Sequence, residues 1–539
     1  ECSKNNSKMK TLSRLSLMFL VLLTVFSCGK ESKESVAEFH SITPVQSSVT
    51  MDDDGNATVE FMVDEPGYSF NYNVGSPDCA VSLRRQDGSE SDIFRITGIS
   101  PTESEGTYSV TIADLGVSGD CEESVRFAMR LPQGTMVYSK PFIIKSNDFD
   151  GRIKVRTGLP VVYVDTEDEK EVVSKEDYLK AVFKINGMGR FGDLEEVPCS
   201  VRGRGNTTWT WPKKPYLIKF DKKQSIFGLP KHKRWILLAN FMDRTLMRNL
   251  IAYKVGSMTS LDWTPHCQSV ELVMNGKHVG NYLLIEQIRA DSNRVPCEDG
   301  FLLECDFHYD NEIQWIQTPG KCMQMQDGIP FGIKYPDYDD GLTGLMLNEI
   351  KEYVRTVSEV IYGENFKDDS EGYAKYLDVK SFIDYWIVFE VMINHELGNP
   401  GSVFLHKSAD GKLTAGPIWD FDWGVLSYNV SPQARNGLVN RDSFWYARLF
   451  DDPDFKAAVK SRWNELLPQL KTIPAFIDEM EKTLQTSAEL NFKMWNPAED
   501  ASQNGGVIVN GDERMTYNAA VERLKKIYEE RLEIISKNL

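Results

Sequence analysis

Cysteine and histidine are few in this sequence, and positive charges are outnumbered by negative ones. Its 539 residues include nine cysteines, none in a Cys-x-x-Cys pair, and seven histidines that lack the spacing of a metal site. Structural zinc sites use such closely spaced pairs, so this composition argues against one. The sequence contains 61 Lys and Arg residues and 79 Asp and Glu residues, so its net charge is −18. Nucleic-acid binding needs a basic surface, so we expect no nucleic-acid partner.

The N-terminal apolar run, Leu15–Phe26, is too short for a transmembrane helix, which needs about 20 residues. It follows a basic flank and ends at Ser27-Cys28. A basic flank, a short apolar core and a small residue before the cleavage point are typical of a secretory signal, which we place at residues 1–28.

Cys28 stands where bacterial lipoproteins carry the cysteine that receives the lipid. We therefore expect an exported protein, periplasmic or at the cell surface, that meets the membrane only through this anchor. A plain signal peptide with an incidental cysteine is the alternative. The residues before Met9 look additional to the start, and residues 29–38 form a short charged tether. Export permits disulfides, but the sequence leaves their pairing open.

Short alternating segments fill residues 39–147. Examples are Ala57–Val63, Thr107–Ile112 and Ser124–Met129, and glycine-containing turns separate such segments. Strands of period two at this spacing, without a long helical pattern, predict an all-β immunoglobulin-like sandwich.

Strands and helices are mixed after a linker at Asn147–Gly151, so residues 148–539 form a second domain of α+β class. We predict a short helix over Lys175–Leu179 and a strongly apolar helix over Asp378–Leu397. The C-terminal segment Tyr517–Leu539 has the pattern of an amphipathic helix.

Two segments of the second domain have clear local signatures. In Trp235–Asn249, a strand runs into a helix for which Asp243 is the expected N-cap. In Val270–Ile288, two apolar strands meet at Asn275-Gly276, which is a strong hairpin signal.

Two further segments carry polar groups suited to phosphate chemistry. Arg202–Trp209 alternates arginine and glycine, which lets backbone amides approach an anion beside positive charge. A Gly-Arg turn in a hairpin is the simpler interpretation, and the segment matches no Walker loop. Lys412–Gly424 reads as a strand that ends on the carboxylates Asp420 and Asp422.

Taken together in their order along the chain, the four segments resemble the kinase-like family of spore coat protein H (CotH), over roughly residues 150–470. The resemblance implies an atypical protein-kinase-like domain of two lobes that bind ATP between them. With the N-terminal signal and sandwich, the chain resembles a bacterial lipoprotein of this family. Its activity would be phosphate transfer from ATP, with Mg²⁺ or Mn²⁺, to a protein or glycan acceptor.

The resemblance also implies roles for individual residues. Asp420 resembles the metal-binding Asp of the kinase Asp-Phe-Gly element, and Asp422 is its partner. Lys214 is the candidate for the phosphates, with Lys219 as its competitor. Arg204 would neutralise phosphate or pair internally, and Glu286 lies at the position of the hinge between the lobes.

The segment His395–Phe404 departs from the family pattern. The family places an Asp shortly after Glu-Leu-x-Gly-Asn, whereas Pro400 and Gly401 follow Asn399 here. Glu396 is the nearest carboxylate, and Asn399 would ligate a metal only through its amide oxygen. Asn is no general base, so the departure bears on catalysis more than on fold.

Two other functions remain open. A kinase-fold surface lipoprotein with weak or no turnover would act in binding or adhesion. A carbohydrate-handling protein would use paired carboxylates, but Asp420 and Asp422 are too close in sequence to flank a glycosidic bond, which needs carboxylates about 5–9.5 Å apart.

Overall fold

The structure is a computed structural model. It describes residues 42–52, 56–63, 81–91, 94–104, 106–114, 122–130, 136–145, 157–188, 190–308, 313–322, 327–500 and 509–539. The predicted signal, Cys28, the tether and the linker at Asn147–Gly151 lie outside these residues. The chain divides into two compact units, Glu1–Arg156 and Thr157–Leu539.

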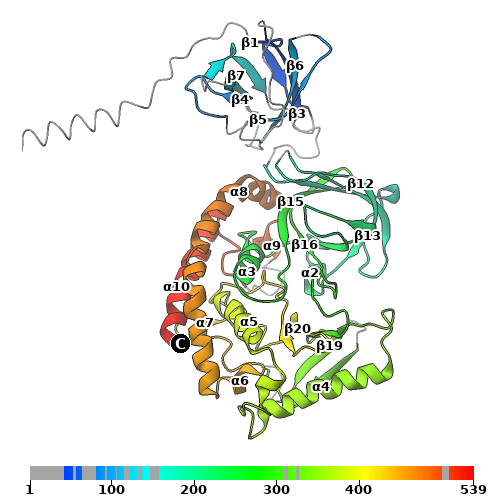
Figure 1. Cartoon of the computed structure of the whole chain (residues 1–539), viewed down its shortest axis with the longest axis vertical. Helices are drawn as coiled ribbons and strands as arrows, with labels where there is room; N and C mark the ends of the chain where they lie inside the picture. The colour runs from blue at the N-terminus through cyan, green and yellow to red at the C-terminus, as the bar shows by residue number, and fades with distance from the viewer. Residues whose placement is uncertain are drawn as a thin grey trace, which may run out of the picture. The chain divides into compact units, whose positions relative to one another are not determined.

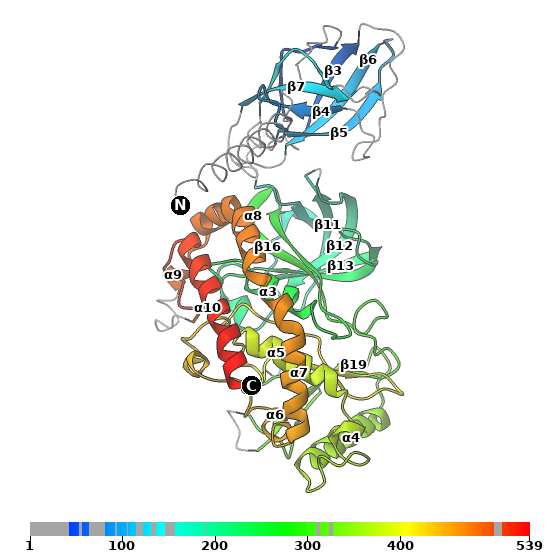
Figure 2. The same ribbon diagram turned by 60° about the vertical axis from the view of Figure 1, so that its left-hand side comes forward.

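The N-terminal unit is a β-sandwich (Figure 2). One sheet has the strand order β1-β3-β6-β5, and the other has the order β2-β9-β7-β4, with β8 added beside β7. Alternate residues of β3 are buried, and Phe61 of β3 meets Phe127 of β7 with ring centroids 5.0 Å apart. The predicted all-β sandwich is confirmed, and its immunoglobulin type stays a prediction. The bounds are β1 Ile42–Pro44, β2 Ser48–Thr50, β3 Asn56–Val63, β4 Val81–Arg84, β5 Phe94–Pro101, β6 Thr107–Asp114, β7 Glu122–Arg130, β8 Met136–Tyr138 and β9 Phe142–Lys145.

A closed barrel of seven strands begins the second unit (Figure 1). Its order is β10-β11-β12-β13-β14-β16-β15, and the parallel pairing of β10 with β15 closes it. In β14, Trp235 and Leu237 join the core of the barrel, while Ile236 and Leu238 face the rest of the unit. The bounds are β10 Val161–Thr166, β11 Leu179–Asn186, β12 Leu194–Gly203, β13 Tyr216–Gln224, β14 His232–Leu238, β15 Cys267–Met274 and β16 Lys277–Glu286.

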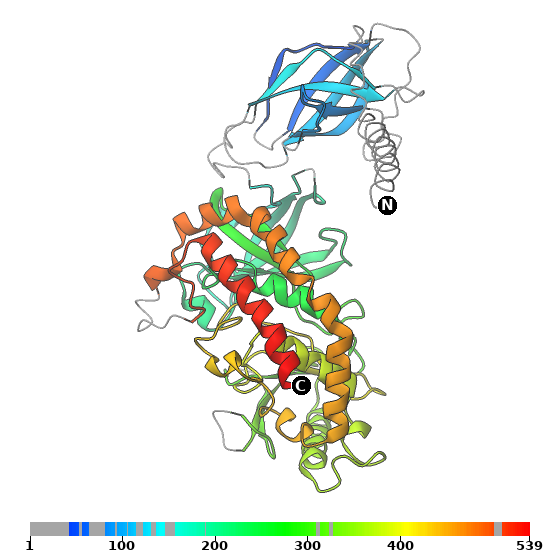
Figure 3. The same cartoon turned by 90° about the vertical axis from the view of Figure 1, so that its left-hand side faces the viewer.

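A second, antiparallel sheet and most of the helices complete this unit. The sheet order is β18-β19-β17-β20-β21. Helix α8 packs on β16 and α10 packs on α8 (Figure 3). The strand bounds are β17 Phe301–Cys305, β18 Gln314–Gln317, β19 Ile329–Tyr335, β20 Val403–Lys407 and β21 Thr414–Ala415. The helix bounds are α2 Thr207–Thr210, α3 Arg248–Gly256, α4 Gly344–Tyr362, α5 Val379–Val391, α6 Tyr446–Leu449, α7 Pro453–Leu470, α8 Ile473–Met494, α9 Pro497–Asp500 and α10 Tyr517–Asn538. None of the helices in the described ranges has the length and apolar character that crossing a bilayer requires.

Two local predictions are confirmed. The hairpin of β15 and β16 turns at Asn275 and Gly276, whose φ values of 48° and 71° suit a tight two-residue turn. The C-terminal helix is α10.

Other local predictions are wrong. Residues Lys175–Leu179 form no helix, because the Ser174 hydroxyl accepts the amides of Glu176 and Asp177 in a turn and β11 begins at Leu179. The apolar helix ends at Val391, six residues before Leu397, and Ile393 has a φ of 55°. Asp243 is not the N-cap of α3, whose N-cap is Met247.

Candidate functional site

A cavity of about 1040 Å³ lies between the barrel and the second sheet. Side chains of β13 and β14 form one apolar wall, and side chains of β17, β19 and β20 form another. These wall residues are Leu217, Ile236, Leu238, Leu302, Ile333 and Phe404. The volume is at the upper end of the range for small-molecule sites, which are mostly apolar with a few placed polar groups. The cavity therefore has the size and walls to hold a flat, partly apolar ligand.

The loop that carries Asp420 and Asp422 borders this cavity and is fixed by asparagine side chains. The Oδ1 of Asn249 accepts the amide of Phe421 at 2.9 Å, and Asn394 Nδ2 donates to the carbonyl of Asp420 at 3.3 Å. Asn510 accepts the amide of Gly424 and donates to the carbonyl of Asp422. These bonds hold Asp420 in the left-handed region, at a φ of 65°. The carboxylates thus project from a backbone that three asparagine side chains hold by hydrogen bonds.

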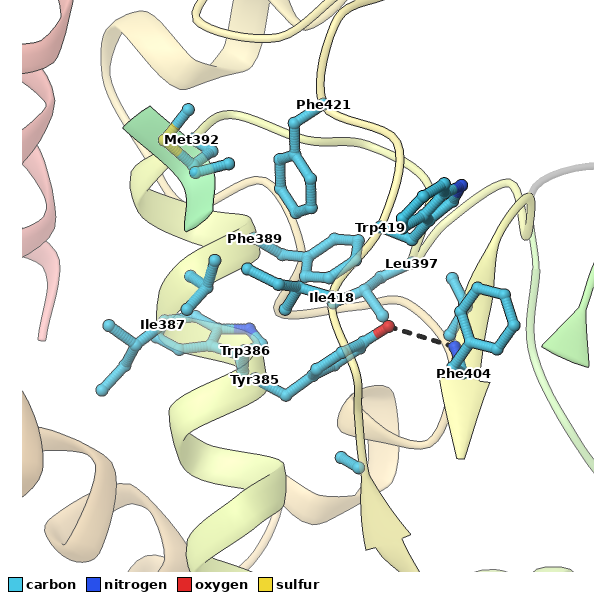
Figure 4. Packing of buried hydrophobic residues seen from close by; sticks show 14 of the residues in the cluster. Tyr385, Trp386, Ile387, Phe389, Met392, Leu397, Phe404, Ile418, Trp419 and Phe421 are labelled. Carbon is cyan, nitrogen blue, oxygen red and sulfur yellow. Dashed lines mark hydrogen bonds between the residues drawn. The ribbon is translucent and has the colours of Figure 1, made fainter. Parts of the chain in front are cut away.

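An aromatic core supports the same loop. Phe421 packs edge-on against Phe389 of α5, with ring centroids 5.1 Å apart, and Tyr385 accepts a hydrogen bond from the amide of Phe404 (Figure 4). The predicted strand is shorter than expected, since β21 ends at Ala415 and the carboxylates lie on the loop beyond it.

Burial raises the pKa of the acidic groups here, and repulsion from Asp420 adds to the shift for Asp422 and Glu396. Burial raises the pKa of Asp420, although Arg204 opposes the shift. Burial and then Asp420 hold the pKa of Asp422 well above its usual range. Burial, followed by Asp420, Asp306 and Asp422, does the same for Glu396. A cation among these carboxylates would relieve the repulsion and favour their charged forms.

Several buried polar atoms in the cavity wall lack a hydrogen-bond partner among the described residues. They include Glu396 Oε2, Asn399 Oδ1, His395 Nδ1 and Asn240 Nδ2. An unsatisfied buried polar atom costs about 1–3 kcal/mol, so their concentration in one cavity points to a ligand that completes them.

The donor set suits a metal held jointly with phosphate. Within the described ranges, no three His, Cys, Asp or Glu side chains form a group that could hold a metal ion. Mg²⁺ commonly takes one or two carboxylates and completes its octahedron with water and substrate phosphates. Asp420, Asp422 and the free Oδ1 of Asn399 fit that pattern.

Arg204 supplies positive charge beside these carboxylates. It lines the cavity with its guanidinium 5.6 Å from the centre of the Trp419 ring. Its side chain donates no hydrogen bond to a described residue. Burial lowers its pKa, while Asp420 counteracts that shift. The adjacent Gly205 is required, because it has a φ of 85° and a Cβ there would lie 2.0 Å from the Thr208 hydroxyl.

The sequence model of the CotH kinase protein family matches residues 201–535, more than half of the chain. The chain belongs to this family. No curated protein matches it. Among solved structures, fibronectin(III)-like modules of Clostridium thermocellum CbhA are similar over 33% of this chain and 86% of that chain. Their identity is 10% and the TM-score is 0.13, which is too low to support an argument.

The cavity of this CotH family member gathers some of the predicted residues and not others. Arg204, Glu396, Asn399, Asp420 and Asp422 line it together. This grouping spans more than 200 positions of sequence, and it forms because the segments that follow β12, α5 and β21 meet at the cavity.

The other predicted residues, Lys214, Lys219 and Glu286, do not line the cavity. The ammonium of Lys214 donates to the carbonyl of Trp209 at 2.8 Å. Lys219 is exposed on β13. Buried Glu286 accepts hydrogen bonds from the amide and ring of His266, at 3.0 and 2.9 Å.

Two arginines of the cavity wall received no role from the sequence alone. Arg202 and Arg289 both line the cavity. Arg202 stood inside the Arg-Gly-Arg motif but was not assigned a role, and Arg289 lies just beyond the hairpin motif. No sequence spacing identifies a single arginine as part of a site. Only the fold therefore reveals that Arg202 and Arg289 lie at the cavity wall.

Proposed function

We propose that this CotH family member binds a nucleoside triphosphate, ATP, with Mg²⁺ or Mn²⁺ in the cavity and transfers a phosphoryl group to an acceptor hydroxyl. The observation that supports it best is the meeting of Arg204 with Asp420 and Asp422 beside apolar walls. Phosphoryl transfer depends mainly on positioning and on neutralising charge around the phosphates. We further propose that the barrel and the helix-rich remainder correspond to the two lobes of an atypical protein kinase.

The residues divide into three roles in this proposal. Asp420, Asp422 and Asn399 would hold the metal, which when bound neutralises phosphate charge. Arg204 would pair with the phosphate oxygens, because a guanidinium forms strong bidentate bonds to phosphate. Apolar residues such as Ile236 and Leu302 would enclose the base.

Glu396 is the candidate general base in place of the Asp that the family pattern has after Asn399. Its Oε2 is unpaired at the cavity wall, and a carboxylate of raised pKa accepts a proton near neutral pH. The hydroxyl proton would pass to Glu396 as the acceptor oxygen bonds to the γ-phosphorus. The bond between that phosphorus and the β–γ bridging oxygen then breaks, and ADP leaves.

The test is a calorimetric titration of ATP with Mg²⁺ or Mn²⁺ on the wild type and on Asp420→Asn, with Asp410→Asn as a matched control. Asp410 is exposed in the turn between β20 and β21. Loss of one charged ligand should weaken binding at least about tenfold, and the control should match the wild type. Equal affinity in Asp420→Asn, with unfolding unchanged, would exclude the metal role of this loop.

A second candidate function is binding or adhesion by a kinase-fold protein without effective turnover. The observation in its favour is the absence of an Asp directly after Asn399. Nucleotide binding without phosphate transfer to protein or glycan acceptors would favour it. If Asn399→Asp then gained transfer, the missing carboxylate would explain the weak activity.

A further inference from the structure

A cluster of cationic side chains surrounds Tyr178 at the barrel side of the cavity. The guanidinium of Arg202 lies 5.1 Å from the centre of the Tyr178 ring, and the ammonium of Lys219 lies 5.6 Å from it. Arg234 Nη1 donates to the Tyr178 hydroxyl at 3.1 Å. Arg289 lines the same cavity as Arg202, and Arg234 lowers its pKa. Two of the four cations, Arg202 and Arg289, line the cavity itself.

The barrel register brings these like charges together. Lys219 of β13 stands directly opposite Arg234 of β14, and its other neighbour is Ser200 of β12. Arg202 is two residues beyond Ser200, on the same face of the sheet. Like charges that face one another across strands are destabilising, so folding alone gives no reason for this arrangement.

No carboxylate is in salt-bridge contact with these cations within the described ranges. None of Arg202, Lys219, Arg234 and Arg289 forms an ion pair with a described residue. The side chains of Arg202 and Arg289 donate no hydrogen bond to one either, and the Nε atoms of both are buried without a partner. Burial and then Arg234 lower the pKa of Arg289, whereas Asp337 and Asp340 oppose that shift.

Seven described carboxylates line the same cavity, and none of them forms an ion pair with a cation of the cluster. They are Glu176, Glu304, Asp306, Asp337, Glu396, Asp420 and Asp422. Acidic residues are abundant in this chain of net charge −18. Even so, no described acidic residue forms an ion pair with the guanidinium groups of Arg202, Arg234 and Arg289. Unpaired, half-buried guanidinium groups are costly, and an anionic ligand would offset that cost.

We propose that Arg202, Arg289, Arg234 and Lys219 form a second anion subsite, which takes a phosphate or carboxylate group other than the phosphates of the nucleotide. Arg204 belongs to the part of the cavity that contains Asp420. It lies two residues from Arg202, roughly 6–7 Å along the chain. The cavity therefore has two separate positive positions. Anion binding at the subsite is independent of the proposed function, whereas its use by an anionic acceptor rests on that function.

The experiment titrates inorganic phosphate into the full chain by calorimetry, without metal or nucleotide. Arg202→Gln and Arg289→Gln should each weaken phosphate binding at least about tenfold, because each loses charge-assisted hydrogen bonds. Lys222→Gln is the matched control, since Lys222 is exposed on β13 near Lys219. It should bind phosphate within about twofold of the wild type, as a change outside the subsite alters no contact.

Two results would overturn the subsite. The first is unchanged phosphate affinity in the double variant Arg202→Gln/Arg289→Gln when its thermal unfolding matches the wild type. The second is displacement of phosphate by saturating ATP and Mg²⁺, which would assign the cations to the phosphates of the nucleotide. Asp420→Asn separates this proposal from the previous one, because it should lose metal-dependent ATP affinity and keep phosphate binding.

Discussion

At the scale of single residues, the carboxylates of the cavity are defined by their surroundings more than by their identity. Asp420, Asp422 and Glu396 are ordinary acids in the sequence, and burial raises the pKa of each, while repulsion from Asp420 adds to the shift at Asp422 and Glu396. A divalent ion must therefore displace protons that isolated carboxylates would already have lost at neutral pH. Metal affinity should therefore depend on how far these carboxylates are protonated.

We expect Mn²⁺ affinity to rise with pH, by roughly tenfold per pH unit for each proton displaced, and to level off above the raised pKa values. The sign follows from the direction of the shifts: below the raised pKa values the carboxylates are protonated, and protons compete with the metal. Calorimetry between pH 5 and 8 would measure it. Glu396→Gln removes one repelling charge, so its curve should move to lower pH. A flat profile across that range would contradict this dependence on protonation.

Sequence reasoning reached some of these residues because they stand in motifs. Arg204 lies between glycines, and Asp420 and Asp422 flank Phe421, so each has a recognisable pattern. Arg202 and Arg289 line one cavity only because the barrel closes and β12 meets the segment after β16. No local pattern encodes such a contact.

At the scale of elements, α5 and α10 are joined by a buried ion pair. Arg531 of α10 bonds to the Glu390 carboxylate, and its Nε donates to the Glu390 carbonyl at 3.0 Å. Its Nη1 donates to the carbonyls of Ala434 and Gly437. Both charged side chains are fully buried. Removing one partner would leave an uncompensated charge and several unpaired carbonyls.

Arg531→Met should therefore lower the free energy of unfolding by about 3–5 kcal/mol. Lys526→Met on the same helix is the control, because Lys526 is 76% exposed and its distant pairing with Glu530 contributes about 0–1 kcal/mol. Denaturant titration followed by circular dichroism would give both values. A loss below about 1 kcal/mol in Arg531→Met would mean that the helices are held by apolar packing alone.

The same elements show where sequence patterns are sufficient. The hairpin at Asn275-Gly276 and the helix α10 follow from local chemistry, a tight turn and an amphipathic period. The helix predicted to reach Leu397 fails because apolar periodicity continues past Val391, while the Phe389 carbonyl accepts the amide of Asn394 in a turn that ends α5. Asp243 was taken for an N-cap because of its residue type, but it accepts the amide and guanidinium of Arg248 one turn further on.

At the scale of the whole molecule, the chain combines a β-sandwich unit with a larger CotH family unit. The sandwich follows from alternating strands, and the mixed second unit follows from the change in pattern. The boundary predicted at Asn147–Gly151 falls outside the described residues and stays a prediction. Barrel closure by β10 and β15 depends on a pairing between strands about 100 residues apart, which no local pattern specifies.

Membrane attachment belongs to the scale of the whole molecule and stays a prediction from the sequence, which places it at the thiol of Cys28. If Cys28 is lipidated, its acyl chains would carry the attachment. Buried acyl chains contribute about 0.8 kcal/mol per methylene, and stable anchoring takes more than one chain. Cys28→Ala should therefore shift the protein from the membrane to the soluble fraction. Fractionation with immunoblotting would show it, and mass spectrometry of the N-terminus would confirm that the signal is still cleaved. A cleaved Cys28→Ala protein that still sediments with membranes would rule out lipidation at Cys28 as the anchor.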